Sequence, residues 1–252
     1  MTNNNKDPMG TAIADYQKNG IAGRLRVFSP NFDEDEIPVD TLFRDFQEMP
    51  SLEQKALQMA KGQILDVGAG AGCHSIALQE MGKSVTAIDI SELSVQTMKA
   101  RGVEDAQLKD FWLVDSQYDT ILMLMNGIGI VGSIKQMPRF FTHLDKILKP
   151  EGELIVDSTD IKYVFEDDNG NVDLPKGYAY YDNLGNNTYY GELEYQMQYK
   201  RIKGSPFPWL YIDFDTLDKL ASANGFQAQI VEQNDNYQYL ARIARIDNRS
   251  AK

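Results

Sequence analysis

A glycine-rich segment, Asp66-Val67-Gly68-Ala69-Gly70-Ala71-Gly72, carries the most specific chemical signal in the sequence. It follows an apolar stretch typical of a strand and opens a stretch with helical patterning. Glycines allow tight turns and close approach of a ligand to the backbone, and a helix N-terminus presents N–H groups without partners inside the helix. The segment therefore predicts a nucleotide-like ligand at a strand-to-helix turn.

The spacing of these residues disfavours a dinucleotide. The dinucleotide pattern needs Gly or Ala at its last position, and counted from Gly68 that position is Cys73. Asp66 would also place a negative charge beside a pyrophosphate, whereas it suits a ligand with an ammonium group. S-adenosylmethionine has an amino-acid moiety, a sulfonium, a ribose and an adenine but no phosphate, so it fits this loop better than a nicotinamide dinucleotide does.

A second carboxylate, Asp89, ends the next predicted strand, Val85-Thr86-Ala87-Ile88-Asp89. A carboxylate at the end of this strand can accept hydrogen bonds from both hydroxyls of a ribose. The alternative is that Asp89 caps the following helix, a role that Ser91 also fits. We favour Asp89 as the ribose acceptor.

Residues that could act as a general base are few. His74 and His143 are the only histidines. His74 begins the helix after the glycine loop and is expected to pack near the ligand, whereas His143 sits within a helix and is expected to be a surface or packing residue. The candidates by position alone close the fifth strand: Asp157, Ser158, Thr159 and Asp160. No motif names a catalytic residue, and no residues have the spacing of metal ligands.

Strands and helices alternate around these residues. The patterning predicts strands at 64–67, 84–90, 106–108, 118–125 and 153–157, and helices at 73–81, 92–100 and 134–148. A helix at 214–223 then precedes strands near 227–232 and 237–246, while helices at 12–18 and 51–61 come before the alternating part. Such alternation is typical of a mostly parallel sheet covered on both faces.

Two regions interrupt this alternation. Residues 21–50 have no regular pattern, and their acidic run Asp33-Glu34-Asp35-Glu36 is expected to be a solvated loop rather than a metal site. Residues 161–212 are rich in aromatic side chains, with a strand or hairpin predicted at 189–202. This region is either a hairpin packed on the sheet or on another subunit, which would make a homodimer, or an aromatic cover over a substrate.

The composition restricts the partners. Lys and Arg total 25 against 37 Asp and Glu, which gives a formal charge of −12 and a pI of about 4.6. Binding to a phosphate backbone needs several basic contacts, so nucleic acid is disfavoured as a partner. Cys73 is the only cysteine, the N-terminus has no apolar core of a signal peptide, and no stretch approaches the about 18 apolar residues of a membrane span. We therefore expect a cytoplasmic protein.

From about residue 63 to residue 157 the chain resembles the class I S-adenosylmethionine-dependent methyltransferases. The resemblance rests on Leu65–Gly72, on the acidic strand end at Asp89, and on the turn Leu148-Lys149-Pro150-Glu151-Gly152-Glu153-Leu154. It implies a doubly wound, Rossmann-like α/β fold with a seven-stranded, mostly parallel sheet and an antiparallel last strand. To this core the chain would add an N-terminal helical extension and a β-rich insertion.

The resemblance also implies roles for single residues. Asp110 would accept the adenine amino group and the backbone N–H of Phe111 would bind a ring nitrogen, although the pair could instead be a surface carboxylate beside a core aromatic. Asn126 follows the fourth strand, where this family faces cofactor and substrate, and the two prolines of enzymes that methylate nucleic-acid bases are missing there. The expected cofactor-binding residues are Asp66, Gly68, Ala69, Gly70, Gly72, His74, Asp89, Ile90, Asp110, Phe111 and Asn126.

The implied activity is in-line transfer of a methyl group from S-adenosylmethionine to a small-molecule acceptor, for which alignment of the reacting atoms is the main requirement. The alternatives are another adenosyl-group transferase, such as an aminopropyltransferase, and a catalytically silent S-adenosylmethionine-binding module. We expect a single domain over residues 1–252. Its expected parts are an extension at 9–60, the cofactor-binding core at 61–160, the insertion at 161–212 as a substrate cover, and the end of the core at 213–247.

Overall fold

A computed structural model describes residues 6–167 and 169–246, so residue 247 of the predicted core end lies outside the described residues. Among the described residues, one central sheet has seven strands. Their spatial order is β13 (Phe226–Gln233), β14 (Gln238–Arg245), β7 (Leu148–Thr159), β6 (Tyr118–Met123), β3 (Gln63–Val67), β4 (Ser84–Asp89) and β5 (Ala106–Leu108). β14 is antiparallel to both of its neighbours, while β7, β6, β3, β4 and β5 are parallel. The predicted sheet with an antiparallel last strand is confirmed.

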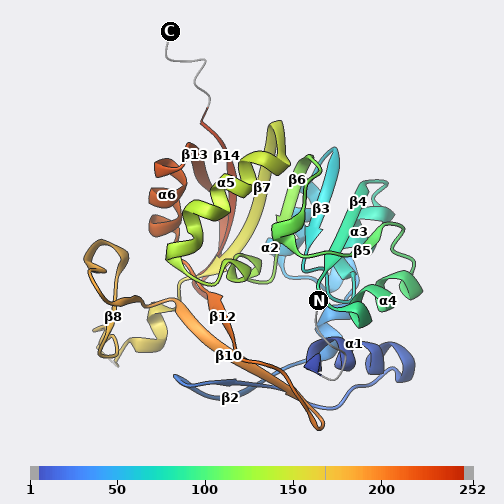
Figure 1. The fold of residues 1–252 in the computed structure, drawn as a ribbon, viewed down its shortest axis with the longest axis horizontal. Coiled ribbons are helices and arrows are strands. Elements are labelled where there is room, and N and C mark those ends of the chain that lie inside the picture. The colour runs from blue at the N-terminus through green and yellow to red at the C-terminus, as the bar shows by residue number, and fades with distance from the viewer. Residues whose placement is uncertain (1–5, 168, 247–252) are drawn as a thin grey trace.

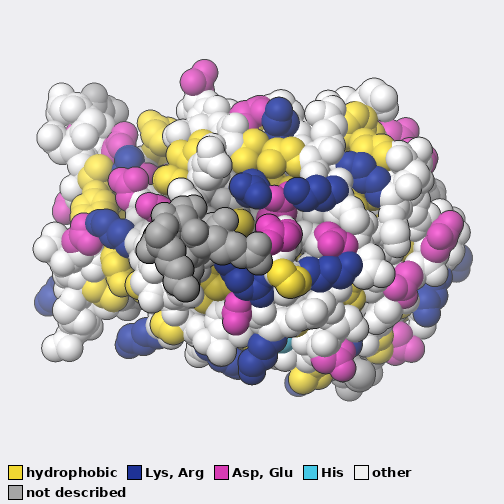
Figure 2. Space-filling model, turned by 90° about the horizontal axis from the view of Figure 1, so that it is seen from above, with side chains coloured by type: hydrophobic (Ala, Val, Ile, Leu, Met, Phe, Trp, Pro, Cys, Tyr) yellow, Lys and Arg dark blue, Asp and Glu magenta, His cyan; other side chains and the backbone are white. Residues whose placement is uncertain are grey.

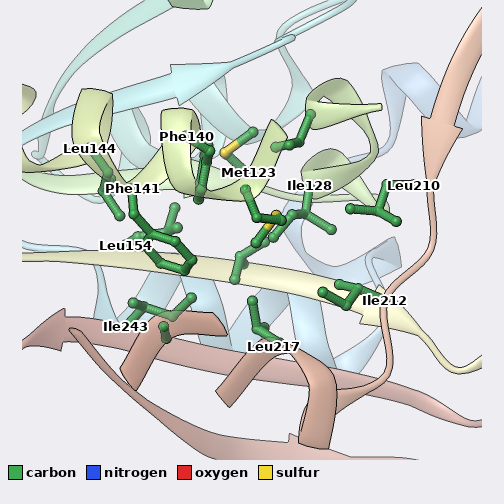
Figure 3. Close-up of a cluster of buried hydrophobic side chains, with 14 of the residues drawn as sticks. Met123, Ile128, Phe140, Phe141, Leu144, Leu154, Leu210, Ile212, Leu217 and Ile243 are labelled. Atoms are coloured by element: carbon green, nitrogen blue, oxygen red, sulfur yellow. The ribbon is translucent and has the colours of Figure 1, made fainter. Parts of the chain in front are cut away.

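Helices cover both faces of this sheet (Figure 1). The α-helices in the described residues are α1 (Pro8–Asn19), α2 (Ser51–Met59), α3 (Cys73–Glu80), α4 (Glu92–Arg101), α5 (Met137–Ile147) and α6 (Phe214–Ala223). On one face Leu57 of α2 and Leu78 of α3 pack with Ile64 of β3. On the other face, α5 and α6 meet β7 through Phe141, Leu217 and their neighbours (Figure 3). Burial of one such side chain contributes about 1.5–3 kcal/mol.

The parallel strands deliver the predicted site residues to one edge of the sheet. The carboxyl ends of β3, β4, β6 and β7 lead into the glycine loop, Asp89, the Asn126 turn and Asp160. Short 3-10 turns follow three of the parallel strands: η4 (Phe111–Leu113) follows β5, η5 (Gly127–Val131) and η6 (Ile134–Gln136) follow β6, and η7 (Ile161–Phe165) follows β7. Three further 3-10 turns lie outside the central sheet: η2 (Val39–Phe43), η3 (Phe46–Glu48) and η8 (Tyr181–Asn183). Ligands of open α/β sheets bind at this edge.

A second sheet lies beside that edge, below the central sheet in Figure 1. Its strands are β11 (Ile202–Lys203), β10 (Glu192–Tyr199), β1 (Leu25–Ser29) and β2 (Phe32–Ile37), with β12 (Phe207–Leu210) paired to β10. A separate small pair joins β8 (Tyr178–Ala179) to β9 (Thr188–Tyr189). Because β1 pairs with β10, residues from the predicted extension and from the predicted insertion share one sheet.

The hairpin of β1 and β2 corrects the prediction of an irregular segment at 21–50. The acidic run Asp33–Glu36 lies in β2 and not in a loop. Arg26 on β1 donates to both Glu34 oxygens at 2.6 and 2.5 Å, which offsets the negative charge of this strand. The opposite face of β1 packs Leu25 against Tyr199 of β10, and both side chains are fully buried. Within the described ranges, no helix is long and apolar enough to cross a membrane.

Candidate functional site

The glycine loop turns sharply between β3 and α3. Gly68, Gly70 and Gly72 have φ angles of 70°, 57° and 82°, a left-handed region that favours glycine. The N–H groups of Gly68 and Ala69 both donate to the carbonyl of Ile88, at 2.9 and 3.1 Å. These bonds tie the loop to the end of β4 and bring it beside Asp89.

Asp89 joins the loop to the start of α4. Its Oδ2 accepts the N–H of Gly70 at 2.9 Å, and its Oδ1 accepts the N–H of Ser91 at 2.8 Å. Ser91 itself caps α4, because its Oγ accepts the N–H of Ser94 at 3.1 Å. Burial raises the pKa of Asp89 to about 6, while the two backbone hydrogen bonds oppose that rise. Each oxygen of the carboxylate can accept a further hydrogen bond.

Asp66 lies at the end of β3 and is almost fully buried. The hydroxyl of Ser75, on the first turn of α3, donates to its Oδ2 at 2.6 Å. Burial raises the pKa of Asp66, and the nearby His74 and the bond from Ser75 oppose this. The Ser75 hydroxyl therefore binds only one of the two carboxylate oxygens of Asp66.

A buried chain of charged residues reaches the loop from the N-terminal part of the protein. Nε2 of His74 lies 2.7 Å from Glu53 Oε2, and Nη2 of Arg44 donates to both Glu53 oxygens at 3.0 and 2.9 Å. Burial alone would lower the pKa of His74, but the hydrogen bond with Glu53 and the charge of Asp66 raise it overall. The contact with Glu53 thus favours the protonated form of the imidazole.

Sequence reasoning missed Glu53 and Arg44. One signal was present for Glu53, because it is a charged residue on the same face of α2 as Ala56 and Leu57, three and four positions on. For Arg44 no local signal exists, since it lies between two 3-10 turns. The side-chain Nε of Arg44 is buried and lacks a hydrogen-bond partner in the described part of the chain.

The chain leaves β6 through two residues with left-handed backbone, Met125 and Asn126, at φ 60° and 57°. The N–H of Asn126 donates to Asp157 Oδ1 at 2.9 Å, and the Thr159 hydroxyl donates to the Asn126 side-chain oxygen at 2.8 Å. Burial raises the pKa of Asp157 to about 7. Two of the position-based candidates of β7 therefore meet Asn126 directly.

The other two candidates at this strand end lie elsewhere. Ser158 Oγ accepts the N–H of Ile212 at 3.0 Å, and Asp160 Oδ1 accepts the hydroxyl of Tyr190 at 2.7 Å. Side chains alternate along a strand, so Ser158 points to the face opposite to Asp157 and Thr159. The four residues do not form one cluster.

Three of the expected cofactor-binding residues follow β4 and β5, and two of them, Asp110 and Phe111, were expected around adenine. Ile90 has a relative exposure of 48%. Asp110 Oδ1 accepts the N–H of Trp112 at 2.9 Å and so caps η4, while its second oxygen takes no part in this bond. The Phe111 ring is buried against Phe140 and His143, so only its backbone could meet a ligand. His143 also contacts the Phe111 carbonyl at 2.8 Å, which makes it a packing residue as predicted.

Helix α1 covers the glycine loop. Its N-cap residue Asp7 accepts the N–H of Gly10 at 2.8 Å and the hydroxyl of Ser91 at 2.5 Å, so it joins α1 to α4. Ile13 of α1 packs with Ala71 of the loop in a small apolar cluster. The extension thereby closes one side of the candidate cofactor site.

The second sheet rests on the turn that follows Asn126. β12 contacts η5, and a Cβ built at Gly129 would lie 2.1 Å from the ring of Trp209. Only glycine allows the indole to approach this closely. The carboxyl end of β6 therefore lies beneath side chains from the predicted insertion.

Known proteins resemble both the core and the whole chain. The family described as "Methyltransferase domain" matches residues 64–152. The putative methyltransferase YqeM of Bacillus subtilis is 32% identical over 117 residues, 42% of this chain and 47% of that protein, so the match spans about half the length of this curated relative.

Two solved structures extend the comparison. A S-adenosylmethionine-dependent methyltransferase from Bacteroides fragilis, in complex with S-adenosyl-L-homocysteine, is 51% identical with a TM-score of 0.88 over 97% of each chain. The CcbJ methyltransferase from Streptomyces caelestis has a TM-score of 0.56 at 14% identity, covering 81% of this chain and 99% of that one. The second likeness concerns the fold alone.

Proposed function

This chain belongs to the S-adenosylmethionine-dependent methyltransferases, and on that premise we propose that it methylates a small molecule held between the second sheet and the carboxyl ends of β6 and β7. The cofactor is S-adenosylmethionine and the product is S-adenosylhomocysteine. When bound, the cofactor supplies an electrophilic methyl group on a sulfonium. The protein has to hold the two reactants in line and exclude water from them.

For the nucleoside half of the cofactor, we assign the ribose to Asp89 and the adenine to Ile90, Asp110 and the N–H of Phe111. The support is that Asp89 already accepts Gly70 N–H and still has lone pairs on both oxygens. The glycine loop, with Gly68, Ala69, Gly70 and Gly72 as predicted, would allow the ligand to approach its backbone. All the residues that we propose to contact the nucleoside were also expected from the sequence to bind the cofactor.

For the amino-acid half, Asp66 would bind the ammonium group, and Arg44 would neutralise the carboxylate. Arg44 has a buried Nε without a partner among the described residues, and an N–H group left in that state costs about 1–3 kcal/mol. A carboxylate ligand would satisfy it with a charge-assisted hydrogen bond. His74 would act indirectly, because it binds Glu53 and thereby helps to hold Arg44. A role for the carboxylate also argues against aminopropyl transfer, which uses a decarboxylated cofactor.

This assignment can be tested with two nucleosides. S-adenosylhomocysteine carries the amino-acid end, whereas 5′-methylthioadenosine lacks it. Arg44→Met should weaken binding of the former at least tenfold in calorimetry and leave binding of the latter within twofold. Arg139→Met is the matched control, because Arg139 is exposed over the Trp112 ring. Equal losses for both nucleosides would count against a carboxylate partner.

The acceptor is proposed to be a small molecule mainly because extension and insertion form a single sheet over the site. β1 pairs with β10 and β12 contacts η5, so the second sheet lies against the turn that follows Asn126. The net charge of −12 agrees with this. The face in Figure 2, which lies at the opposite end of the central sheet from the second sheet, also has basic and acidic side chains interspersed.

The test is a screen for acceptors. Release of S-adenosylhomocysteine should be stimulated by members of a small-molecule library and not by tRNA or duplex DNA at low salt. Stimulation by nucleic acid alone, with a steep salt dependence, would contradict the proposal. We expect three residues to face the acceptor: Asn126, Asp157 and Thr159. The cytoplasmic location expected from the sequence stays a prediction.

A further inference from the structure

A separate cavity of about 550 Å³ opens at the same sheet edge, beyond β7. It lies among η8, the start of α6 and the ends of β13 and β14, and none of its lining residues belongs to the glycine loop, Asp89 or the Asn126 turn. Six aromatic rings line it: Tyr180, Tyr181, Tyr190, Phe214, Tyr237 and Tyr239. Its size is that of a small-molecule site. We propose that this cavity binds a small organic cation, a ligand that carries an ammonium group.

The aromatic lining comes from three parts of the chain. Tyr180, Tyr181 and Tyr190 belong to the predicted insertion, and Phe214 begins α6. Tyr237 directly precedes β14, and Tyr239 lies within it. Such rings have negative faces, which attract a cation placed within about 6 Å of a ring centre. Several rings converging on one space therefore favour a cation over a neutral ligand of equal size.

The charges on the cavity wall favour the same ligand. Of the lining residues, four are carboxylates and two are lysines. Each lysine is already bound to one carboxylate, since Lys162 lies 2.9 Å from Asp160 and Lys219 lies 2.6 Å from Asp182. The lining lysines therefore leave two carboxylates, Asp213 and Asp215, without a cationic partner of their own.

The Asp213 carboxylate is oriented by hydrogen-bond donors. Tyr189 and Thr216 donate to its Oδ2, both at 2.6 Å, and the N–H of Thr216 donates to its Oδ1 at 2.9 Å. Burial and the charge of Asp213 raise the pKa of Tyr189, so this hydroxyl stays a donor. The negative potential of Asp213 is thus fixed by the fold, and a bound cation would gain from it without breaking these hydrogen bonds.

The second of these carboxylates, Asp215, is exposed on the first turn of α6. The hydrogen bond with Asp182 raises the pKa of Lys219, and the charges of Asp215 and Asp213 raise it further. Because Lys219 lines the cavity, the charges of these two carboxylates act at the cavity wall. Asp213 and Asp215, which form no ion pair with a lining lysine, would therefore repel an anionic ligand. The proposal does not depend on which acceptor is methylated, because the cavity shares no residue with the proposed cofactor site.

The experiment compares choline with 3,3-dimethylbutan-1-ol, which has the same shape without the charge. Both are titrated by NMR into the full chain saturated with S-adenosylhomocysteine. Choline should bind with a Kd of millimolar order or below, and at least tenfold more tightly than the alcohol. Asp215→Asn and Tyr181→Ala should each weaken choline binding at least fivefold, while binding of S-adenosylhomocysteine stays within twofold.

Asp218→Asn is the matched control, because Asp218 lies on the same helix and does not line the cavity. It should leave choline binding unchanged, and thermal melting should show that all three variants remain folded. The proposal is overturned if choline does not bind, if it binds no better than the alcohol, or if the two cavity variants behave like the control.

Discussion

The backbone N–H of Gly70 donates to the carboxylate of Asp89 at 2.9 Å, which makes the glycine loop and the end of β4 a single unit. The fold itself thus orients the Asp89 carboxylate. Because its second oxygen accepts the N–H of Ser91, the carboxylate cannot rotate without losing both bonds. A ribose would meet a carboxylate that is held in place, which lowers the entropic cost of binding.

Asp89→Ala should weaken binding of S-adenosylhomocysteine by about 1–3 kcal/mol, because two ribose hydroxyls would lose a charged acceptor. The substitution also leaves the N–H groups of Gly70 and Ser91 without this partner, so a modest loss of thermal stability is expected. Asp89→Asn keeps one acceptor oxygen, so its affinity for S-adenosylhomocysteine should lie between those of the unchanged protein and of Asp89→Ala. Calorimetry measures both variants. Unchanged affinity together with a collapse in stability would show that Asp89 serves the loop alone.

Cofactor affinity should depend on pH through the same residue. Burial raises the pKa of Asp89 to about 6, and hydroxyl donors of a ribose favour the ionised form. Binding below that pKa must release a proton, so affinity should rise as the pH increases from 5 to 6, approach about tenfold per pH unit at the acid end, and level off above 7. Calorimetry in buffers of differing ionisation enthalpy would detect the released proton. Asp89→Asn should remove this dependence, and a slope that persists in the variant would assign it to another group.

Gly70→Val should abolish cofactor binding. Gly70 has a φ of 57°, where a β-branched residue is strained, and a Cβ there would have only Ile13 of α1 nearby, at 3.9 Å. The added side chain would fill the space between the loop and α1. Gly82→Val is the control, because Gly82 has a φ of 74° and open space around it away from the loop. Similar losses of stability are expected for both variants, with loss of affinity for Gly70→Val only. Retained affinity in folded Gly70→Val would mean that the ligand does not approach Gly70.

The core of the fold could be predicted because its signals are local. Apolar strands, the glycine loop and the segment Leu148–Leu154 follow one another in the order that a doubly wound sheet requires, although that segment, predicted as a turn, forms the start of β7. The hairpin of β1 and β2 could not be predicted in the same way. Four of the six residues of its second strand are acidic. The hairpin forms because Arg26 pairs with Glu34 and because β10, far along the chain, pairs with β1.

The site residues also divide into those that local sequence predicts and those that depend on contacts with distant segments. Asp66, the loop glycines and Asp89 stand within one βαβ unit, so their spacing alone brings them together. Arg44 and Glu53 reach the loop only through the packing of the N-terminal segment on α3, which no local pattern encodes. Asp157 was placed correctly at the strand end, but its contact with Asn126 depends on the left-handed turn after β6.

The second sheet should control turnover more than cofactor binding. Removing residues 163–210 altogether would be a poor test, because β10 contributes the buried Tyr199 to a core shared with Leu25. Trp209→Ala is sharper, since Trp209 packs on Gly129 directly after the Asn126 turn. The variant should keep affinity for S-adenosylhomocysteine within a few-fold. Turnover of an acceptor found in the screen should fall at least tenfold, because small misplacements of reacting groups cost rate steeply.

Phe28→Ala provides the matched control for Trp209→Ala. Phe28 lies in β1 of the same sheet, on the face that carries Arg26 and Lys203, away from the Leu25 core. Its loss should leave kcat and KM for the acceptor within twofold, with a thermal shift no larger than that of Trp209→Ala. If Trp209→Ala retained full turnover while folded, or if both variants lost activity equally, the sheet would be a scaffold and not the cover of the acceptor site.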